Sequence, residues 1–593
     1  MVPRCLSLLV AVAPAPALAC GGFFCSGQVP IEQAGEQIVF GVEGTTVTAH
    51  IRVNYQGGAE DFSWVLPLPT EPTVAVGTDA LFQSLQRLTA PTFRVDWVSF
   101  PHCLERCSPE DEPVTDACCG GDDDGGTAAP SLPSSSSSVS LLAEGDAGAY
   151  EYEVVQATSG DILFDWLNDN GYDQPESARA LVGHYVNLGF VFLAVRLQKN
   201  KDSGSLQPIV LKYESPDLAC VPLKLTSIGA TENMPVTVYV LANARAIPLN
   251  FFHAEPDLRA YPWLACANNG WWSEGEGGEA CSAYGDAWGG LVSATADLAN
   301  GRAFVTDFAG KTPAAELNLP AIELPLAELR MIDEPMAYLR EVPDDVVNDP
   351  IVRQLMTEFM PMPEGLPSKC DDPSEYYVVS EFVFFNSDAC LIMHPPAIPF
   401  DPVGMTNALD ERIVQPRLAA RAILAEHPYL TRLSTIISPD EMTKDPIFSF
   451  NPDLQDVPRE RFVKVSAECG DVAFRGFHLE YQDGTSDFVE HETMSCAVPD
   501  LTRVPTPQIQ VMHEFGPAEN VLPGQLAQQE TALDLRVPRP DQSSVDQRSQ
   551  SHAQDKGSRS GQSTGCAMGG ANPTVAMLIG LALATLRWRR RRS

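Results

Sequence analysis

The chain has 593 residues, which is too long for a single hydrophobic core, and its 44% apolar content is enough for roughly two to four globular domains. Its 39 Lys and Arg are outnumbered by 78 Asp and Glu, and six of the basic residues lie in terminal segments without any acid, so the chain between the two ends carries 33 basic against 78 acidic residues, a charge of −45. Such a surface repels phosphate backbones and anionic lipid, which argues against nucleic acid as a partner. A solvated acidic surface is the simplest interpretation, with divalent-cation binding, calcium above all, as the alternative.

Residues 1–19 have the pattern of a secretory signal peptide. Arg4 precedes a short apolar run, and Ala17 and Ala19 give the small-x-small arrangement that signal peptidase accepts. We therefore expect cleavage between Ala19 and Cys20. Two interpretations of Cys20 stay open: an ordinary N-terminus whose cysteine pairs locally with Cys25, or a lipidated cysteine.

Residues 20–107 form the first predicted part, which is rich in β-strands. Apolar and polar residues alternate on both sides of a turn at Glu43-Gly44, which predicts a hairpin. The sequence then predicts a strand over 61–69, a helix over 78–89 and a strand over 93–100. Residues 108–149, rich in Asp, Gly, Pro and Ser, are predicted to be an exposed low-complexity loop.

Residues 150–345 form a second β-rich part. A strand over 150–158 precedes two helices, over 161–172 and 176–188, the first of them ended by Asn170-Gly171. Strands are then predicted over 190–198, 208–215, 221–229 and 235–245, and a helix over 290–301 precedes a strand over 302–310.

Residues 346–537 are predicted to be a mixed α/β part, with helices near 345–360 and 410–427, an extended course over 428–457 and strands over 461–470 and 474–482. Residues 538–565 are a predicted disordered linker that reaches roughly 30 Å as a flexible coil. The expected fold class is therefore mainly β with α (α+β), with antiparallel, sandwich-like sheets and disulfide-stapled loops.

The cysteines favour an exported protein. Of the 15 cysteines, Cys5 lies in the signal peptide and Cys566 in the tail, which leaves 13 in the body. Many have close neighbours in Gly- or Pro-rich surroundings, which is typical of short disulfide loops in an oxidising compartment. The disulfide candidates are Cys20, Cys25, Cys103, Cys107, Cys118, Cys119, Cys266, Cys281, Cys370, Cys390, Cys469 and Cys496. Metal ligation by the group from Cys103 to Cys119 is the competing interpretation, and Cys220 is left over.

No catalytic motif stands out. Neither His491-Glu492 nor His513-Glu514 continues as HExxH, and the chain contains no G-x-S-x-G, P-loop or GxGxxG. We therefore predict no catalytic, cofactor-binding or metal residues. One concentration of aromatic residues suggests a ligand platform, with aromatic packing over a small disulfide loop as the alternative. Its members are Trp263, Trp271, Trp272 and Trp288.

The segments CGGFFC, QAGEQIVF, TVTAHIRVNYQG and EDFSWVLPLP, and later WLNDNGY, LKYESPDLACVPLKLTSIGA, PVTVYVLANARAIP and AFVTDFAG, resemble the bacterial family called domain of unknown function 2330. The resemblance runs from Cys20 to about Gly310, and YLTRLSTIISPDEMTKDPIFSFNPDL resembles a further stretch of larger members. It implies secreted or surface proteins, without an established activity and without catalytic residues to carry over.

Residues 566–593 resemble the MYXO-CTERM sorting signals, in which a cysteine before the membrane segment is the site of processing and attachment. Here Cys566 precedes an apolar segment over 571–586 and the cluster Arg589–Arg592. As a helix, that segment spans only about 24 Å, against about 30 Å of hydrocarbon. The expected partners are the membrane and a sorting protease, and a plain single-span membrane protein is the alternative.

Together these features predict an exported protein at the cell surface or outer membrane, anchored at its C-terminus, with a non-enzymatic binding or structural role and an unknown ligand. Two other classes stay open. One is a secreted hydrolase whose site is not visible as a motif, and the other is a calcium-stabilised adhesion module.

Overall fold

The computed structural model describes residues 23–24, 32–56, 63–99, 139–172, 174–198, 206–215, 219–264, 285–314, 319, 324–347, 349–363, 396–469, 474–490 and 506–536. The chain divides into two compact units, residues 1–526 and residues 527–593. The sheets described below lie in the first unit. Helix α15 (Leu526–Asp534) begins at its last residue and otherwise belongs to the second unit.

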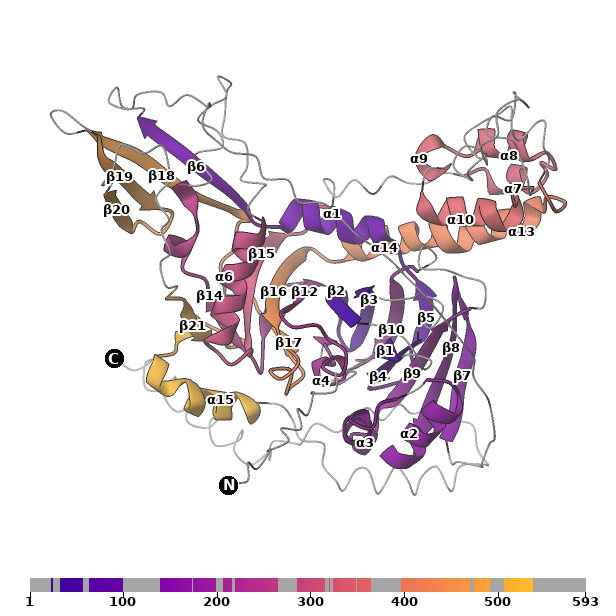
Figure 1. The fold of residues 1–593 in the computed structure, drawn as a ribbon, viewed down its shortest axis with the longest axis horizontal. Coiled ribbons are helices and arrows are strands. Elements are labelled where there is room, and N and C mark those ends of the chain that lie inside the picture. Colours follow the sequence, from indigo (N-terminus) through magenta and orange to yellow (C-terminus); the bar gives the residue numbers. More distant parts are fainter. Residues whose placement is uncertain are drawn as a thin grey trace, which may run out of the picture. The chain divides into compact units, whose positions relative to one another are not determined.

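The largest sheet among the described residues has ten strands in the order β22-β21-β14-β15-β16-β12-β2-β3-β10-β5 (Figure 1). Neighbouring strands are antiparallel except for the pairs β12–β2 and β14–β15. The strands are β2 (Glu32–Glu43), β3 (Thr46–Gln56), β5 (Thr73–Val76), β10 (Ile209–Glu214), β12 (Met234–Ala242), β14 (Phe252–Glu255), β15 (Ala303–Lys311), β16 (Tyr429–Ile437), β21 (Gln508–Val511) and β22 (Glu519–Asn520).

A five-stranded antiparallel sheet packs against one face of the ten-stranded sheet. Its order is β1-β4-β9-β8-β7. The strands are β1 (Phe23–Phe24), β4 (Ser63–Leu68), β7 (Val139–Ala147), β8 (Tyr150–Ala157) and β9 (Val191–Leu197). The shared core contains Ile38 and Val238 from the large sheet and Leu66 and Leu193 from the small one. This apolar face-to-face contact is the arrangement of a β-sandwich.

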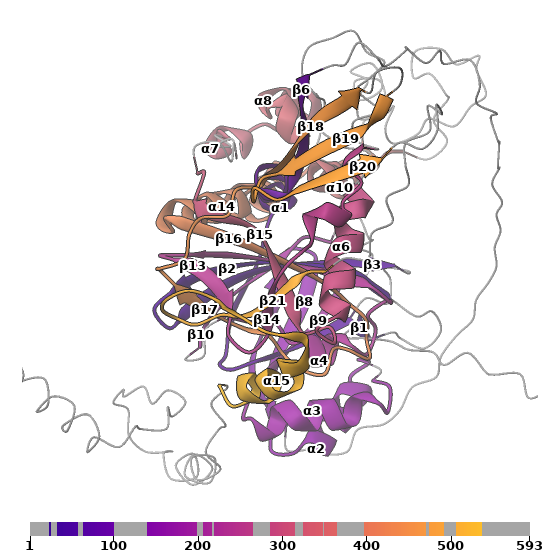
Figure 2. The same ribbon diagram turned by 90° about the vertical axis from the view of Figure 1, so that its left-hand side faces the viewer.

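Helices cover the outer faces of both sheets. Helices α2 (Gly160–Asp169) and α3 (Ala178–Asn187) lie side by side and pack on the five-stranded sheet, where Phe164 contacts the core around Phe192 (Figure 2). Helices α1 (Asp79–Thr89) and α14 (Gln415–Glu426) cover the ten-stranded sheet, with Leu81 and Ile423 packed around Val39. Successive residues of a strand therefore face different layers, as strand alternation requires: Ile38 and Phe40 lie in the core between the sheets, and Val39 lies under the helices.

Two smaller sheets complete the described strands of the first unit. One has the order β11-β17-β13, with β11 (Ala219–Cys220), β13 (Arg245–Pro248) and β17 (Ile447–Asn451). The other has the order β20-β19-β18-β6, with β6 (Thr92–Ser99), β18 (Glu460–Cys469), β19 (Phe474–Tyr481) and β20 (Ser486–Glu490). An aromatic core with Phe93, Tyr261 and Trp263 lies on the latter, beside helix α6 (Gly285–Asp297).

A group of helices, which we call the helical module, has its own core. It consists of α7 (Leu326–Leu329), α8 (Pro335–Glu341), α9 (Asp344–Val347), α10 (Pro350–Phe359) and α13 (Pro402–Leu409). A π-helical segment, η5 (Asp410–Val414), joins α13 to α14. Among the described residues, the other short helices are α4 (Leu223–Thr226), η3 (Leu258–Ala260) and η6 (Pro523–Gln525).

Strands from both sides of residue 346 share these sheets. Strand β16 lies between β12 and β15, which come from the earlier part of the chain, and β18 pairs in parallel with β6. The ten-stranded sheet is therefore built from segments that are far apart in the sequence.

The structure confirms the predicted α+β fold with several antiparallel sheets. The predicted hairpin is β2–β3, which turns at Gly44 with a φ of +61°. The predicted helix over 78–89 is α1, whose first turn is capped by the Thr78 hydroxyl. The strand predicted over 221–229 is wrong, because Leu223–Thr226 forms helix α4.

Among the described residues, no helix combines the length and the apolar character needed to cross a bilayer. The low-complexity loop predicted over 108–149 is wrong at its end, because Val139–Ala147 forms strand β7, which pairs with β8. The predicted signal peptide, residues 108–138 of that loop, the linker and the tail over 566–593 lie outside the described residues. Their predictions stay predictions.

Candidate functional site

Most of the residues singled out from the sequence lie outside the part of the chain that the structure describes. These are Ala19, Cys20, Cys25, Cys103, Cys107, Cys118, Cys119, Cys266, Trp271, Trp272, Cys281, Cys370, Cys390, Cys496 and Cys566. Cys469 is the last residue of β18, and Cys220 is partly buried in β11, opposite Ile447. The predicted disulfide pairs therefore stay predictions.

Trp263 and Trp288 are the described members of the predicted aromatic platform; Trp263 is buried, and Trp288 is partly buried and packs against the same core. Trp263 is 1% exposed, and its Nε1 donates a hydrogen bond to the carbonyl oxygen of Leu258 at 2.7 Å. The ring of Trp288 lies 5.5 Å from that of Phe93, which stacks on Tyr261 at 4.0 Å. In these two positions the rings pack the core under the four-stranded sheet.

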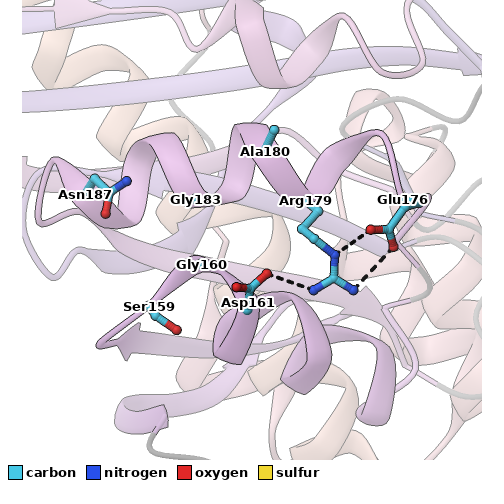
Figure 3. A pocket seen from close by; sticks show the side chains of 8 residues that line it. All are labelled: Ser159, Gly160, Asp161, Glu176, Arg179, Ala180, Gly183 and Asn187. Atoms are coloured by element: carbon cyan, nitrogen blue, oxygen red, sulfur yellow. Dashed lines mark hydrogen bonds and ion pairs between the residues drawn. The ribbon is translucent and has the colours of Figure 1, made fainter.

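The concave surface between α2 and α3 is a shallow groove of about 550 Å³ (Figure 3). It is lined by Ser159, Gly160, Asp161, Glu176, Arg179, Ala180, Gly183 and Asn187. The two helices approach closely because both carry glycine at the crossing: a Cβ on Gly160 would lie 2.3 Å from the Cα of Gly183. The Ser159 hydroxyl accepts a hydrogen bond from the Ile162 backbone and caps α2.

Arg179 is the basic residue of this groove, and it contacts carboxylates of α2 and of the turn that precedes α3. It pairs with Glu176 at 2.6 Å, Asp161 at 3.0 Å and Asp165 at 3.4 Å, and its guanidinium lies 4.1 Å from the centre of the Phe164 ring. Three carboxylates around one guanidinium leave the groove with a net negative charge. Its chemistry therefore suits the ammonium or guanidinium group of a basic ligand.

Buried ionisable groups form a second set of candidate residues, and Glu36 is one of them. Glu36 is 3% exposed on β2, on the same face as Ile38 and Phe40, and its carboxylate accepts a hydrogen bond from Gln33 Nε2 at 3.2 Å. Burial raises the pKa of Glu36 from 4.5 to about 7. This carboxyl group is therefore half-protonated near neutral pH.

Two histidines are buried in the ten-stranded sheet. His50 on β3 is 1% exposed, and burial lowers its pKa to about 4. His253 on β14 is 2% exposed and bridges two strands: its Nδ1 lies 3.0 Å from Gln510 Oε1, and its Nε2 lies 2.9 Å from Thr306 Oγ1. Burial and, second, the charge of Arg245 lower the pKa of His253 to about 3, so both histidines are neutral at pH 7.

Asp307 and Arg432 form a buried ion pair between β15 and β16. Arg432 Nε lies 3.0 Å from Asp307 Oδ2, and the two side chains are 8% and 1% exposed, respectively. Trp288 Nε1 donates a hydrogen bond to the Asp307 carboxylate at 3.2 Å, and Arg461 Nη2 donates to the Asp307 carbonyl oxygen at 3.2 Å. Asp307 lies at a β-bulge between Thr306 and Phe308, which turns its side chain toward these partners.

Asp445 ties the turn before β17 to helices α3 and α4. Its carboxylate accepts hydrogen bonds from Tyr185 Oη and from the Lys224 backbone, each at 2.9 Å. Burial raises the pKa of Asp445. On the exposed side of this contact, Lys224 Nζ lies 3.1 Å from His184 Nε2, and burial and the lysine charge together lower the pKa of His184.

The sequence reasoning missed these buried ionisable residues. For Glu36 a signal was present, because strand alternation places it on the face of Ile38 and Phe40. For Asp307 and Arg432 the signal was weaker, since each is one charge within an apolar strand, and their pairing depends on a strand order that joins distant segments.

The fold and these sites together define a mixed α/β protein built on antiparallel sheets, in which buried ionisable groups bind other parts of the same chain. The chain belongs to the domain of unknown function 2330 family, described as an uncharacterised protein conserved in bacteria, whose match covers residues 14–347, more than half of the 593 residues. No curated protein and no solved structure matches this chain.

Proposed function

We propose that this protein is exported, anchored at the cell surface through its C-terminus, and acts there as a non-enzymatic binding or structural protein. One structural observation carries the non-enzymatic part. Ionisable groups with strongly shifted pKa values often mark catalytic sites. Here burial lowers the pKa of His253 to about 3 and raises that of Asp445, and each bonds to a residue on a distant segment, Gln510 and Tyr185 respectively.

These bonds give the shifted groups a structural role. His253 joins β14 to β21, and Asp445 joins the turn before β17 to α3, so the residues that follow 347 are bonded to the family region at several points. A rigid body of this kind suits display outside the cell. The acidic groove around Arg179 offers such a protein a concave surface for a basic ligand.

Anchoring rests on the sequence of the tail. Cys566 precedes an apolar segment that is short for a permanent membrane span, and arginines follow that segment. The proposed sequence of events is membrane insertion of the segment, cleavage by a sorting protease next to Cys566, and attachment through that cysteine. Two or more lipid chains would be needed for lasting attachment.

The test is cell fractionation combined with protease treatment of intact cells. The native protein should be in the surface fraction and be degraded by external protease. The Cys566→Ala variant should fold and yet accumulate in the inner membrane at a larger mass, whereas a Ser563→Ala control should behave as the native protein does. Native protein that is protected from external protease, or a Cys566→Ala variant that reaches the surface normally, would contradict the proposal.

A further inference from the structure

The chain leaves the ten-stranded sheet at the end of β15 and returns to it at the start of β16, and these two strand ends are neighbours. Strands β15 and β16 are antiparallel neighbours, and Lys311, the last residue of β15, is opposite Tyr429, the first residue of β16. Beyond them, the Thr312 backbone N–H donates to the Pro428 carbonyl oxygen at 2.9 Å, and the Thr312 hydroxyl donates to the His427 carbonyl oxygen at 2.7 Å. The two strand ends are paired as in a β-hairpin. In place of a short turn, the chain between them forms the helical module and α14.

The helical module has a hydrophobic core of its own. All the buried members of this core come from residues 329–413, and none of them belongs to another core of the described residues. Inside it, the hydroxyl groups of Tyr338 and Thr406 are hydrogen bonded at 2.9 Å. A segment with a separate core is able to unfold as a separate unit.

Hydrogen bonds join the module to the sheets at η5. Figure 1 shows α13 continuing into α14, and the segment between them is η5. Within η5, Arg412 Nε donates to Gln207 Oε1 at 3.0 Å, and Gln207 Nε2 donates back to the Arg412 carbonyl oxygen at 2.8 Å. Beside it, Glu411 accepts a hydrogen bond from the Gly148 backbone at 3.2 Å. A π-helical turn within a longer helix often marks a functional joint.

We propose that the helical module is an inserted, second cooperative unit, which opens and recloses while the sheets stay folded, with η5 as its joint. Three observations carry the proposal: the hairpin-like bonds at Thr312, the separate core, and the hydrogen bonds at Arg412. The hydrogen bonds between β15 and β16, and those of Thr312, do not involve residues of the module. Opening of the module therefore leaves the β15–β16 ladder intact. The module can therefore change its conformation while the sheets of the described chain stay folded.

Native-state hydrogen exchange on the full-length protein tests this proposal. In the Leu355→Ala variant, which removes a buried side chain of the module core, exchange of the amides in α8, α10 and α13 should rise by about 30-fold or more. Exchange in β12 and β16 should change by less than about twofold. The matched control is Val238→Ala, which removes a buried side chain from the sheet core and should raise exchange in β12 and β16.

A milder variant covers the case in which Leu355→Ala fails to fold. Val352→Ala, also buried in the module core, should raise exchange of the module amides alone, by a smaller factor. If either module variant raises exchange in the β15–β16 ladder by the same factor as in the module, the two parts unfold as one unit and the proposal is wrong.

Discussion

Replacing Glu36 by Gln should stabilise the protein in a manner that depends on pH. Glu36 is 3% exposed between apolar side chains of the sheet core, and burial raises its pKa from 4.5 to about 7. The folded state therefore binds this proton more tightly than the unfolded state does. The contribution of Glu36 to stability is complete below about pH 4.5, falls as the pH rises, and is lost above about pH 7.

The magnitude follows from the pKa values. At about 1.36 kcal/mol for each pH unit, a rise from 4.5 to about 7 corresponds to about 3 kcal/mol. Gln has nearly the same shape as Glu, keeps a hydrogen-bonding partner for Gln33, and does not titrate. The free energy of unfolding of Glu36→Gln, minus that of the native protein, should therefore grow by about 3 kcal/mol between pH 4.5 and pH 8.

Urea unfolding of both proteins at several pH values, followed by circular dichroism, measures this difference. Subtraction cancels the titration of every group that both proteins share. A difference that stays constant from pH 4.5 to pH 8 would refute the assignment of Glu36 as a buried carboxyl group with a raised pKa.

Three further predictions follow from buried or crowded positions. Asp307→Asn leaves the buried Arg432 guanidinium without a counter-charge, and should cost about 3–5 kcal/mol in urea unfolding; a cost below about 1 kcal/mol would contradict the ion pair. Gly160→Ala drives a methyl group into the backbone of α3 and should lower the free energy of unfolding by about 1–3 kcal/mol. The control Gly290→Ala, with open space around it, should be neutral or stabilising. Equal effects of the two variants in thermal melts would count against the close helix crossing. His253 stays neutral in the folded state because its pKa is lowered to about 3, so its contribution to the free energy of unfolding is present above pH 6.5 and is lost as the pH falls toward 3. His253→Asn should therefore reduce the loss of stability between pH 6.5 and pH 3 in urea unfolding. An unchanged loss of stability in this pH range would argue against the burial of His253.

Local elements could be predicted from the sequence because their signals are local. The β2–β3 hairpin has alternating residues around Gly44, and α1 begins at the capping residue Thr78. Helix α4 was mistaken for a strand because its apolar residues fit both periods. The contact that favours the helix is distant, since the Lys224 backbone donates to the Asp445 carboxylate. That bond joins residues more than two hundred positions apart, which no local pattern reports.

The candidate site shows the same division. Burial of Glu36 could have been inferred because Glu36, Ile38 and Phe40 alternate along one strand and so share its buried face. The Asp307–Arg432 pair could not, because it needs β16 to lie beside β15 and a β-bulge to turn the Asp307 side chain. The insertion of the helical module between two neighbouring strands likewise becomes visible when the strand order is known.

The proposed surface anchoring is tested most directly by the intact mass of the native protein purified from the surface fraction of its cells. The account predicts a chain that begins at Cys20, ends at or next to Cys566 and carries added lipid mass on the C-terminal cysteine. A mass that still includes residues 567–593 would show that the tail is retained, and would contradict anchoring through a processed Cys566.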